Sequence, residues 1–226
     1  MNYFDYYKKN FSRRIKFTKK YSYVYRIIAD EINKYMSSNS RISIYCAGHS
    51  IITNYLKFKS AYVGEIIDEF LCLFKLNKNI FKLKENKKVD EVVVCDLEYA
   101  SNPVQKMIDL NRLLNSDGKV YIVSNNIFWN PFFKLLEILN LKFRHPRKNL
   151  ISSNFIENLC FLTDFRIVKK KRFLLFPFKI FFFSSLMNNF FAKIPFINYF
   201  CLIQLFVLRS NNKEKLCLEH LKTSII

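Results

Sequence analysis

Short apolar runs alternate with segments of helical periodicity through the first half of the chain. Residues 22–36 repeat apolar side chains every three or four positions, as does the segment that opens with Pro103. This spacing predicts amphipathic helices. The predicted strands are residues 41–46, 61–64, 92–95 and 119–124, with a weaker one at 80–84 and short helices at 50–57 and 65–75 between them. Strands that alternate with helices indicate a parallel sheet joined by right-handed crossovers.

The pattern changes after this first half. The elements predicted there are two helices, a strand and a long apolar strand, at residues 130–140, 152–163, 165–168 and 200–208. A phenylalanine-rich segment of about 172–198 is inserted between the last two strands. We expect one α/β domain over residues 1–210, followed by a polar tail at 211–226, because 226 residues are enough for one sizeable core.

The chain contains only three glycines, and each adjoins a predicted strand. Gly48 and Gly64 follow strands, whereas Gly118 ends the helix that opens at Pro103 and precedes the next strand. Glycine is needed where the backbone turns sharply or approaches a ligand. These positions are typical of an α/β nucleotide-binding sheet, whose ligand lies outside the carboxyl ends of the strands where strand order reverses.

The composition adds a strong positive charge. Lys and Arg number 37 against 18 Asp and Glu, which gives a formal net charge of +19. Such a charge would point to nucleic acid or an anionic membrane. However, the lysines are spread along a chain that is also rich in Phe, Asn, Ile and Tyr, the usage expected of an A- and T-rich coding sequence. We favour this compositional origin and do not expect nucleic-acid binding.

The cysteines show no metal-binding or disulfide pattern. They lie mostly in apolar runs, without C-x-x-C spacing or partnering histidines, and are Cys46, Cys72, Cys95, Cys160, Cys201 and Cys217. This predicts buried thiols in a reducing compartment and no metal site. The first residues lack an apolar signal core, so we expect a cytoplasmic protein.

Two phenylalanine-rich stretches raise the question of a membrane. A spanning helix needs about 20 apolar residues. Pro177 and Lys179 interrupt residues 173–187, and residues 194–208 are too short. Neither stretch is expected to span, and a hydrophobic core element is the favoured interpretation. Peripheral contact with a membrane surface is the alternative, because lysines beside aromatic residues suit the interface.

The most specific motif runs from Val89 to Asn126. It reads VDEVVVCDLEYASNP and then, after a helical segment, LNRLLNSDGKVYIVSNN. Here the sequence resembles class I S-adenosylmethionine-dependent methyltransferases, and the resemblance covers roughly residues 3–209. From Asn149 to Arg209 it is similar to the subfamily associated with glycosyltransferases in making cell-surface sugars. The resemblance implies a Rossmann-like fold, with a mostly parallel sheet of the seven-strand type and helices on both faces.

The resemblance also implies a cofactor and a reaction. S-adenosylmethionine would donate a methyl group to a small-molecule or cell-envelope saccharide acceptor. Such a transfer is an in-line displacement, so alignment and proximity can supply much of the catalysis, and a base is needed only for a hydroxyl or protonated amine acceptor. Asp96 matches the acidic position after the fourth strand and is the candidate catalytic residue. The implied cofactor-binding residues are Tyr45, Ala47, Gly48, Glu65 and Asp96.

The cofactor motifs depart from the family pattern. Tyr45, Ala47 and His49 stand where the family has glycine. Ile66 occupies the place of the ribose-binding carboxylate, which leaves the neighbouring acid Glu65, or Asp68, to take that role. These departures keep two alternatives open: a catalytically inactive, methyltransferase-like scaffold or partner protein, and a basic peripheral membrane or RNA-binding module.

Overall fold

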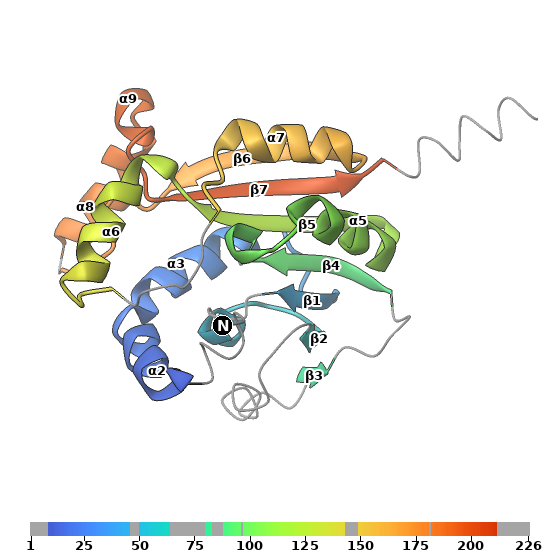
Figure 1. The fold of residues 1–226 in the computed structure, drawn as a ribbon, viewed down its shortest axis with the longest axis horizontal. Helices are drawn as coiled ribbons and strands as arrows, with labels where there is room; N and C mark the ends of the chain where they lie inside the picture. The colour runs from blue at the N-terminus through green and yellow to red at the C-terminus, as the bar shows by residue number, and fades with distance from the viewer. Residues whose placement is uncertain are drawn as a thin grey trace, which may run out of the picture.

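A single mixed sheet forms the centre of the molecule (Figure 1). The computed structural model describes residues 9–45, 50–63, 80–82, 88–95, 97–142, 149–180 and 182–211. The strands are β1 (Arg41–Tyr45), β2 (Ser60–Val63), β3 (Ile80–Lys82), β4 (Val89–Val94), β5 (Leu114–Asn125), β6 (Phe165–Phe173) and β7 (Ile203–Ser210). Their order is β3-β2-β1-β4-β5-β7-β6, and among these strands β7 runs in the direction opposite to the other six. The expected seven-stranded, mostly parallel sheet is confirmed.

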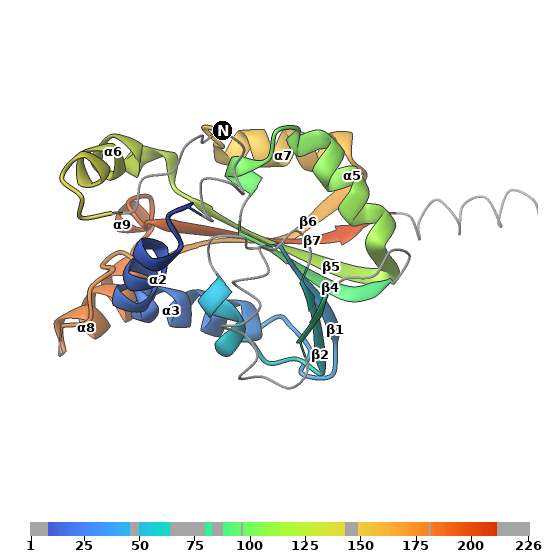
Figure 2. The same ribbon diagram turned by 60° about the horizontal axis from the view of Figure 1, so that its bottom comes forward.

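Helices cover both faces of this sheet, as Figure 2 shows. The α-helices are α2 (Phe11–Lys20), α3 (Ser22–Asn33), α5 (Pro103–Leu113), α6 (Asn130–Ile138), α7 (Ser153–Leu162), α8 (Phe183–Asn189) and α9 (Pro195–Asn198). Short 3-10 helices are η1 (Ser50–Asn54), η2 (Leu97–Tyr99), η3 (Ile127–Trp129) and η4 (Phe191–Lys193). In both views α3 lies on one face and α5 and α7 lie on the other, while α6, α8 and α9 gather at one end.

Alternation along the strands divides the core into two layers. On the face of α3, Ile28 and Ile32 pack with Ile42 and Tyr121. On the opposite face, α5 and α7 pack on the side chains that point the other way, among them Val92 of β4. Successive strand residues point to opposite faces, so each central strand supplies both layers. The apolar spacing of residues 22–36 therefore predicted the buried side of α3 correctly.

Side-chain caps set where the helices on the second face begin. Asn102 Oδ1 accepts a hydrogen bond from the backbone N–H of Gln105 at 3.1 Å, ahead of Pro103 in the first turn of α5. Ser152 Oγ accepts from the N–H of Phe155 at 3.1 Å and caps α7. Both caps satisfy N–H groups that a first helical turn leaves without partners.

The prediction that Asp117 and Gly118 end the helix was wrong. α5 ends at Leu113, and Leu114 already pairs with Val89 in the sheet. A Cβ atom on Gly118 would lie 2.6 Å from Leu114 Cδ2, so a glycine is needed for this close approach rather than for a turn. Gly48, Gly64 and the helix expected at 65–75 lie outside the described residues.

One part of the phenylalanine-rich stretches is buried in the sheet, and another part is exposed. Residues 203–208 form the buried part of β7, which confirms the core interpretation for that segment. In contrast, α8 and α9 expose most of their large apolar side chains. No helix in the described part of the chain is long and apolar enough to cross a membrane. Cys95, Cys160 and Cys201 are buried and free, as predicted.

A buried carboxylate lies near the beginning of β4. Glu91 Oε1 accepts a hydrogen bond from the Tyr121 hydroxyl at 3.2 Å and lies 3.5 Å from Lys119 Nζ. Its other oxygen, Oε2, has no hydrogen-bond partner among the described residues. Burial raises the pKa of Glu91 above its ordinary value, although Lys119 acts in the opposite direction.

This raised pKa makes the stability of the fold depend on pH. The folded protein holds a proton on Glu91 more tightly than the unfolded chain does. Between the pKa of Glu91 in the unfolded chain and its higher pKa in the folded protein, the free energy of unfolding therefore falls by about 1.4 kcal/mol for each unit of rising pH. Glu91→Gln removes this titration. We expect the variant to gain stability relative to the natural protein as the pH rises above the ordinary pKa of a glutamate, as measured by urea unfolding over that range. Glu157→Gln, at an exposed ion pair, is the control, and an unchanged difference across this range would contradict the assignment.

Candidate functional site

The order of the strands reverses between β1 and β4. β2 and β3 lie beyond β1, whereas β5 lies beyond β4, and all these strands are parallel. A ligand crevice forms at the carboxyl ends of the strands at such a point. Tyr45 and Cys95 lie there side by side, and the N–H of Cys95 donates to the carbonyl oxygen of Tyr45 at 2.9 Å.

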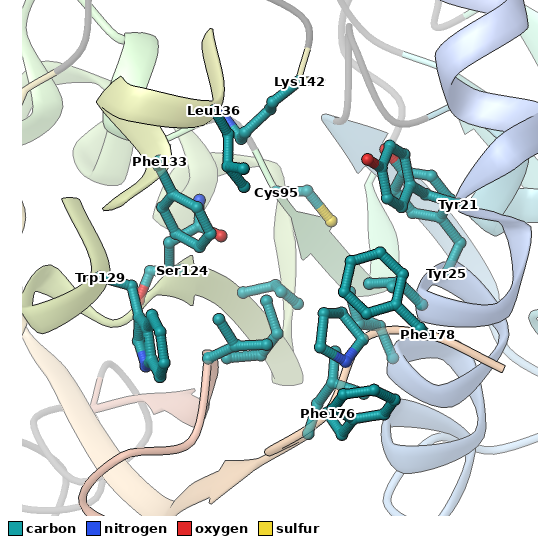
Figure 3. A pocket seen from close by; sticks show the side chains of 18 of the residues that line it. Tyr21, Tyr25, Cys95, Ser124, Trp129, Phe133, Leu136, Lys142, Phe176 and Phe178 are labelled. Carbon is teal, nitrogen blue, oxygen red and sulfur yellow. The ribbon is translucent and has the colours of Figure 1, made fainter. Parts of the chain in front are cut away.

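A cavity of about 350 Å³ adjoins this point (Figure 3). Its walls come from the carboxyl ends of β4 and β5, from α2, α3 and α6, and from residues 174–178. The lining is mainly apolar and aromatic, with Tyr21, Tyr25, Trp129, Phe133, Phe176 and Phe178 around the central space. Its size and apolar character, with few polar groups, are those of a small-molecule site.

One wall of the cavity joins the N-terminal helices to α6. Tyr21, between α2 and α3, donates its hydroxyl to the carbonyl oxygen of Leu141 at 2.8 Å. Burial raises the pKa of Tyr21, so the phenol stays protonated and acts as a donor. Lys142, also in the lining, pairs with Glu137 at 2.8 Å, and its ammonium lies 5.2 Å from the centre of the Phe133 ring.

A short segment that we call the strap, residues 174–178, closes the opposite wall. Asn188 of α8 holds it: its Oδ1 accepts from the N–H groups of Leu175 and Phe176 at 2.8 and 2.9 Å. The Asn188 Nδ2 donates back to the carbonyl oxygen of Phe176 at 2.9 Å. At the start of the strap, the carbonyl oxygen of Leu174 accepts from the N–H of Leu202 at 2.9 Å. The strap is thus fixed although it belongs to no helix or strand.

Two polar residues that the sequence did not single out fix the turn after β5. The buried Glu98 accepts hydrogen bonds from the backbone N–H of Asn125 at 2.8 Å and from its side-chain amide. Asn126 donates to the carbonyl oxygens of Tyr199 and Cys201 at 2.8 and 2.9 Å. The only signal for Glu98 in the sequence was a second acid, two residues after Asp96, in the short segment between the predicted strand 92–95 and the helix that opens at Pro103. Its partner Asn125 comes close only because β4 and β5 pair.

Comparisons with known proteins show which solved structures share this architecture. No protein-family model matches the sequence, and the search of curated proteins found no match. Among solved structures, a chain of the complex between the Haloferax volcanii Trm112 methyltransferase activator and a methyltransferase has a TM-score of 0.62 at 8% identity, covering 92% of this chain and 97% of that one. An S-adenosylmethionine-dependent methyltransferase from Thermotoga maritima has a TM-score of 0.59 at 11% identity, with the same coverage.

A third similar structure is an S-adenosylmethionine-dependent methyltransferase from Clostridium acetobutylicum, with a TM-score of 0.51 at 12% identity, covering 91% of this chain and 96% of that one. The chain has the class I methyltransferase fold. At such low identities the likeness extends to the fold alone. It gives no support to the prediction, made from residues 149–209, of a subfamily associated with glycosyltransferases.

One of the predicted cofactor-binding residues can be placed on this methyltransferase fold. The ring of Tyr45 packs on the face of α5, where the Lys106 ammonium lies 5.3 Å from its centre. The side chain that replaces a family glycine therefore points away from the cavity, which lies on the α3 face. Ala47, Gly48, Glu65 and Asp96 lie outside the described residues, so their roles stay predictions. Of the residues that flank Asp96, Cys95 lines the cavity and Leu97 is buried.

Asn188 offers a test of how the strap is held. Asn188→Ala leaves two backbone N–H groups of the strap without their acceptor, which we expect to cost about 1–3 kcal/mol of unfolding free energy. Asn189→Ala is the matched control, because Asn189 is exposed and donates to the side chain of Ser185. Its effect should stay within about 0.5 kcal/mol. Urea unfolding measures both, and equal losses would show that Asn188 has no special part in fixing the strap.

Proposed function

We propose that this chain is an S-adenosylmethionine-dependent methyltransferase whose acceptor has an apolar or aromatic body. The observation that carries the proposal is the aromatic cavity beside the point of strand reversal between β1 and β4. When bound, S-adenosylmethionine supplies an electrophilic methyl group on a sulfonium sulfur. The chain has to hold donor and acceptor in line and keep water away.

The residues at the strand ends are compatible with that cofactor. The Tyr45 ring packs on the α5 face, so its bulk does not fill the cavity. In this proposal the backbone from Tyr45 to Gly48 lies along the cofactor, Glu65 bonds the ribose hydroxyls, and Asp96 holds the donor next to the acceptor. These carboxylates suit the hydroxyl and ammonium groups of S-adenosylmethionine, because a carboxylate accepts hydrogen bonds from both.

The polar groups of the cavity restrict the chemistry of the acceptor. Tyr21 is kept protonated by burial, and Lys142 is held in an ion pair with Glu137. Both groups donate hydrogen bonds and neither is set up to remove a proton. Neither of these two described lining groups is therefore a base. Unless a residue outside the described part of the chain, such as Asp96, acts as one, the acceptor atom must react without first losing a proton, as a ring nitrogen, a neutral amine, a phenolate or a thiolate does.

A saccharide acceptor fits this cavity only with an apolar substituent. The lining has few groups that could bond to sugar hydroxyls, and a buried hydroxyl without a partner costs free energy. Aromatic rings, in contrast, stack favourably against the planar or apolar part of a ligand. We therefore propose an acceptor that is an aromatic small molecule, or a sugar that carries an apolar group.

Titration with S-adenosylhomocysteine, the product of the donor, tests the proposal. We expect calorimetry to detect binding to the natural protein. Asp96→Ala should weaken it about 10-fold or more, since hydrogen bonds to a charged group contribute about 1.5–3 kcal/mol. Asp109→Ala, on the exposed side of α5, should leave the affinity unchanged. Absence of binding at millimolar S-adenosylhomocysteine and S-adenosylmethionine would refute the enzyme and favour the inactive scaffold.

A further inference from the structure

One end of the molecule exposes an unusual amount of aromatic surface. The elements there are α6, α8 and α9, which lie together in Figures 1 and 2. We call this surface the aromatic end and define it by Phe132, Ile138, Phe178, Phe182, Phe190 and Phe196. Phe196 is 85% exposed, Phe182 75% and Ile138 74%. Large apolar side chains gathered in this way mark an interaction surface.

The aromatic end is held together by specific contacts. The Trp129 indole N–H donates to the carbonyl oxygen of Phe200 at 2.7 Å, which joins the start of α6 to the end of α9. The rings of Phe128 and Phe200 meet edge to face, 5.1 Å apart. On the other side, Asn188 fastens α8 to the strap. The exposed rings are therefore carried by anchored elements.

The charges around this end are almost all positive. Residues 174–202 contain Lys179 and Lys193 and no Asp or Glu. α2, with the sequence FSRRIKFTKK, carries only basic charges, and its Arg13 donates to Asn140 just beyond α6 at 2.6 Å. The one acid of α6, Glu137, is neutralised by Lys142. Exposed phenylalanines bordered by basic side chains are the combination that binds the interface of an anionic membrane.

We propose that the aromatic end docks on the surface of an anionic phospholipid bilayer. A second copy of the chain would set these basic side chains against one another, which costs electrostatic energy. An anionic lipid surface instead attracts each Lys or Arg that comes close to it. The phenylalanines would enter the headgroup boundary, and the lysines would remain at the phosphate level.

Docking in this position connects the bilayer with the cavity. Phe132 and Phe178 line the cavity and are also 46% and 49% exposed, so they form a rim shared by cavity and surface. An acceptor with an apolar body passes from the lipid phase along this rim into the cavity. This last step rests on the proposed methyltransferase function, whereas docking itself does not.

Flotation with lipid vesicles tests the docking surface without any cofactor. The probes are vesicles of phosphatidylcholine alone and vesicles with equal parts of phosphatidylglycerol. We expect the natural protein to float with the anionic vesicles at low salt, and less in molar salt, because screening weakens attraction to a charged surface. Phe196→Ser should weaken this binding roughly tenfold, because it removes a ring that would leave water and enter the headgroup boundary. Phe161→Ser is the matched control, because Phe161 is 86% exposed on α7, away from the aromatic end.

Two charge-reversal variants distinguish attraction of the aromatic end to the vesicles from an effect of the net charge of the protein. Lys193→Glu lies within the aromatic end and should reduce flotation, whereas Lys88→Glu, just ahead of β4 at the other end of the molecule, should leave it unchanged. Failure to float with anionic vesicles at low salt would overturn the proposal. The proposal would also be overturned if Phe196→Ser and Phe161→Ser, or Lys193→Glu and Lys88→Glu, reduced flotation equally. A dimer that light scattering detects and that Phe196→Ser disrupts would overturn it as well. Each of these results would leave cofactor binding, and thus the methyltransferase proposal, untouched.

Discussion

The antiparallel pairing of β7 determines where the site lies. Ile203, the first residue of β7, pairs with Asn125 at the end of β5 and with Phe173 at the end of β6. The connection from β6 to β7 therefore both leaves the sheet and re-enters it on the side where the carboxyl ends of β4 and β5 lie. Had β7 run parallel to β5, this connection would have returned at the opposite edge. The phenylalanine-rich segment forms a wall of the cavity and the aromatic end because of this single reversal.

An irregular connection of this length needs partners for its backbone, which side-chain amides supply. Asn126 bonds two carbonyl groups near the start of β7, and Asn188 bonds three backbone groups of the strap. Asn198 donates to the carbonyl oxygens of Arg172 and Ala192 at 3.0 and 2.7 Å. Buried backbone groups without partners cost free energy comparable to a lost hydrogen bond. These amides fix the turns that link α8, η4 and α9 to one another and to the sheet.

The parts of the fold that could be predicted are those with local signals. Neighbouring residues alone show the apolar runs of β1, β4 and β5 and the helical spacing of α3. Pro103 likewise marks the start of α5. α2 was missed because its sequence, FSRRIKFTKK, is mostly polar and its Phe17 faces the cavity rather than the sheet. The end of α5 was misjudged because Leu114 enters the sheet by pairing with the distant Val89. The cavity joins Tyr21 to Leu141 and β5 to the strap, and such long-range contacts leave no local pattern.

The central claim is that the methyl donor and an apolar acceptor meet beside the carboxyl ends of β1 and β4. A crystal structure of the protein with S-adenosylhomocysteine tests it most directly. We expect the ligand at these strand ends, with its sulfur atom facing the cavity that Cys95 and Tyr21 line. Electron density for the ligand at another place, or a sulfur atom that faces away from this cavity, would contradict it.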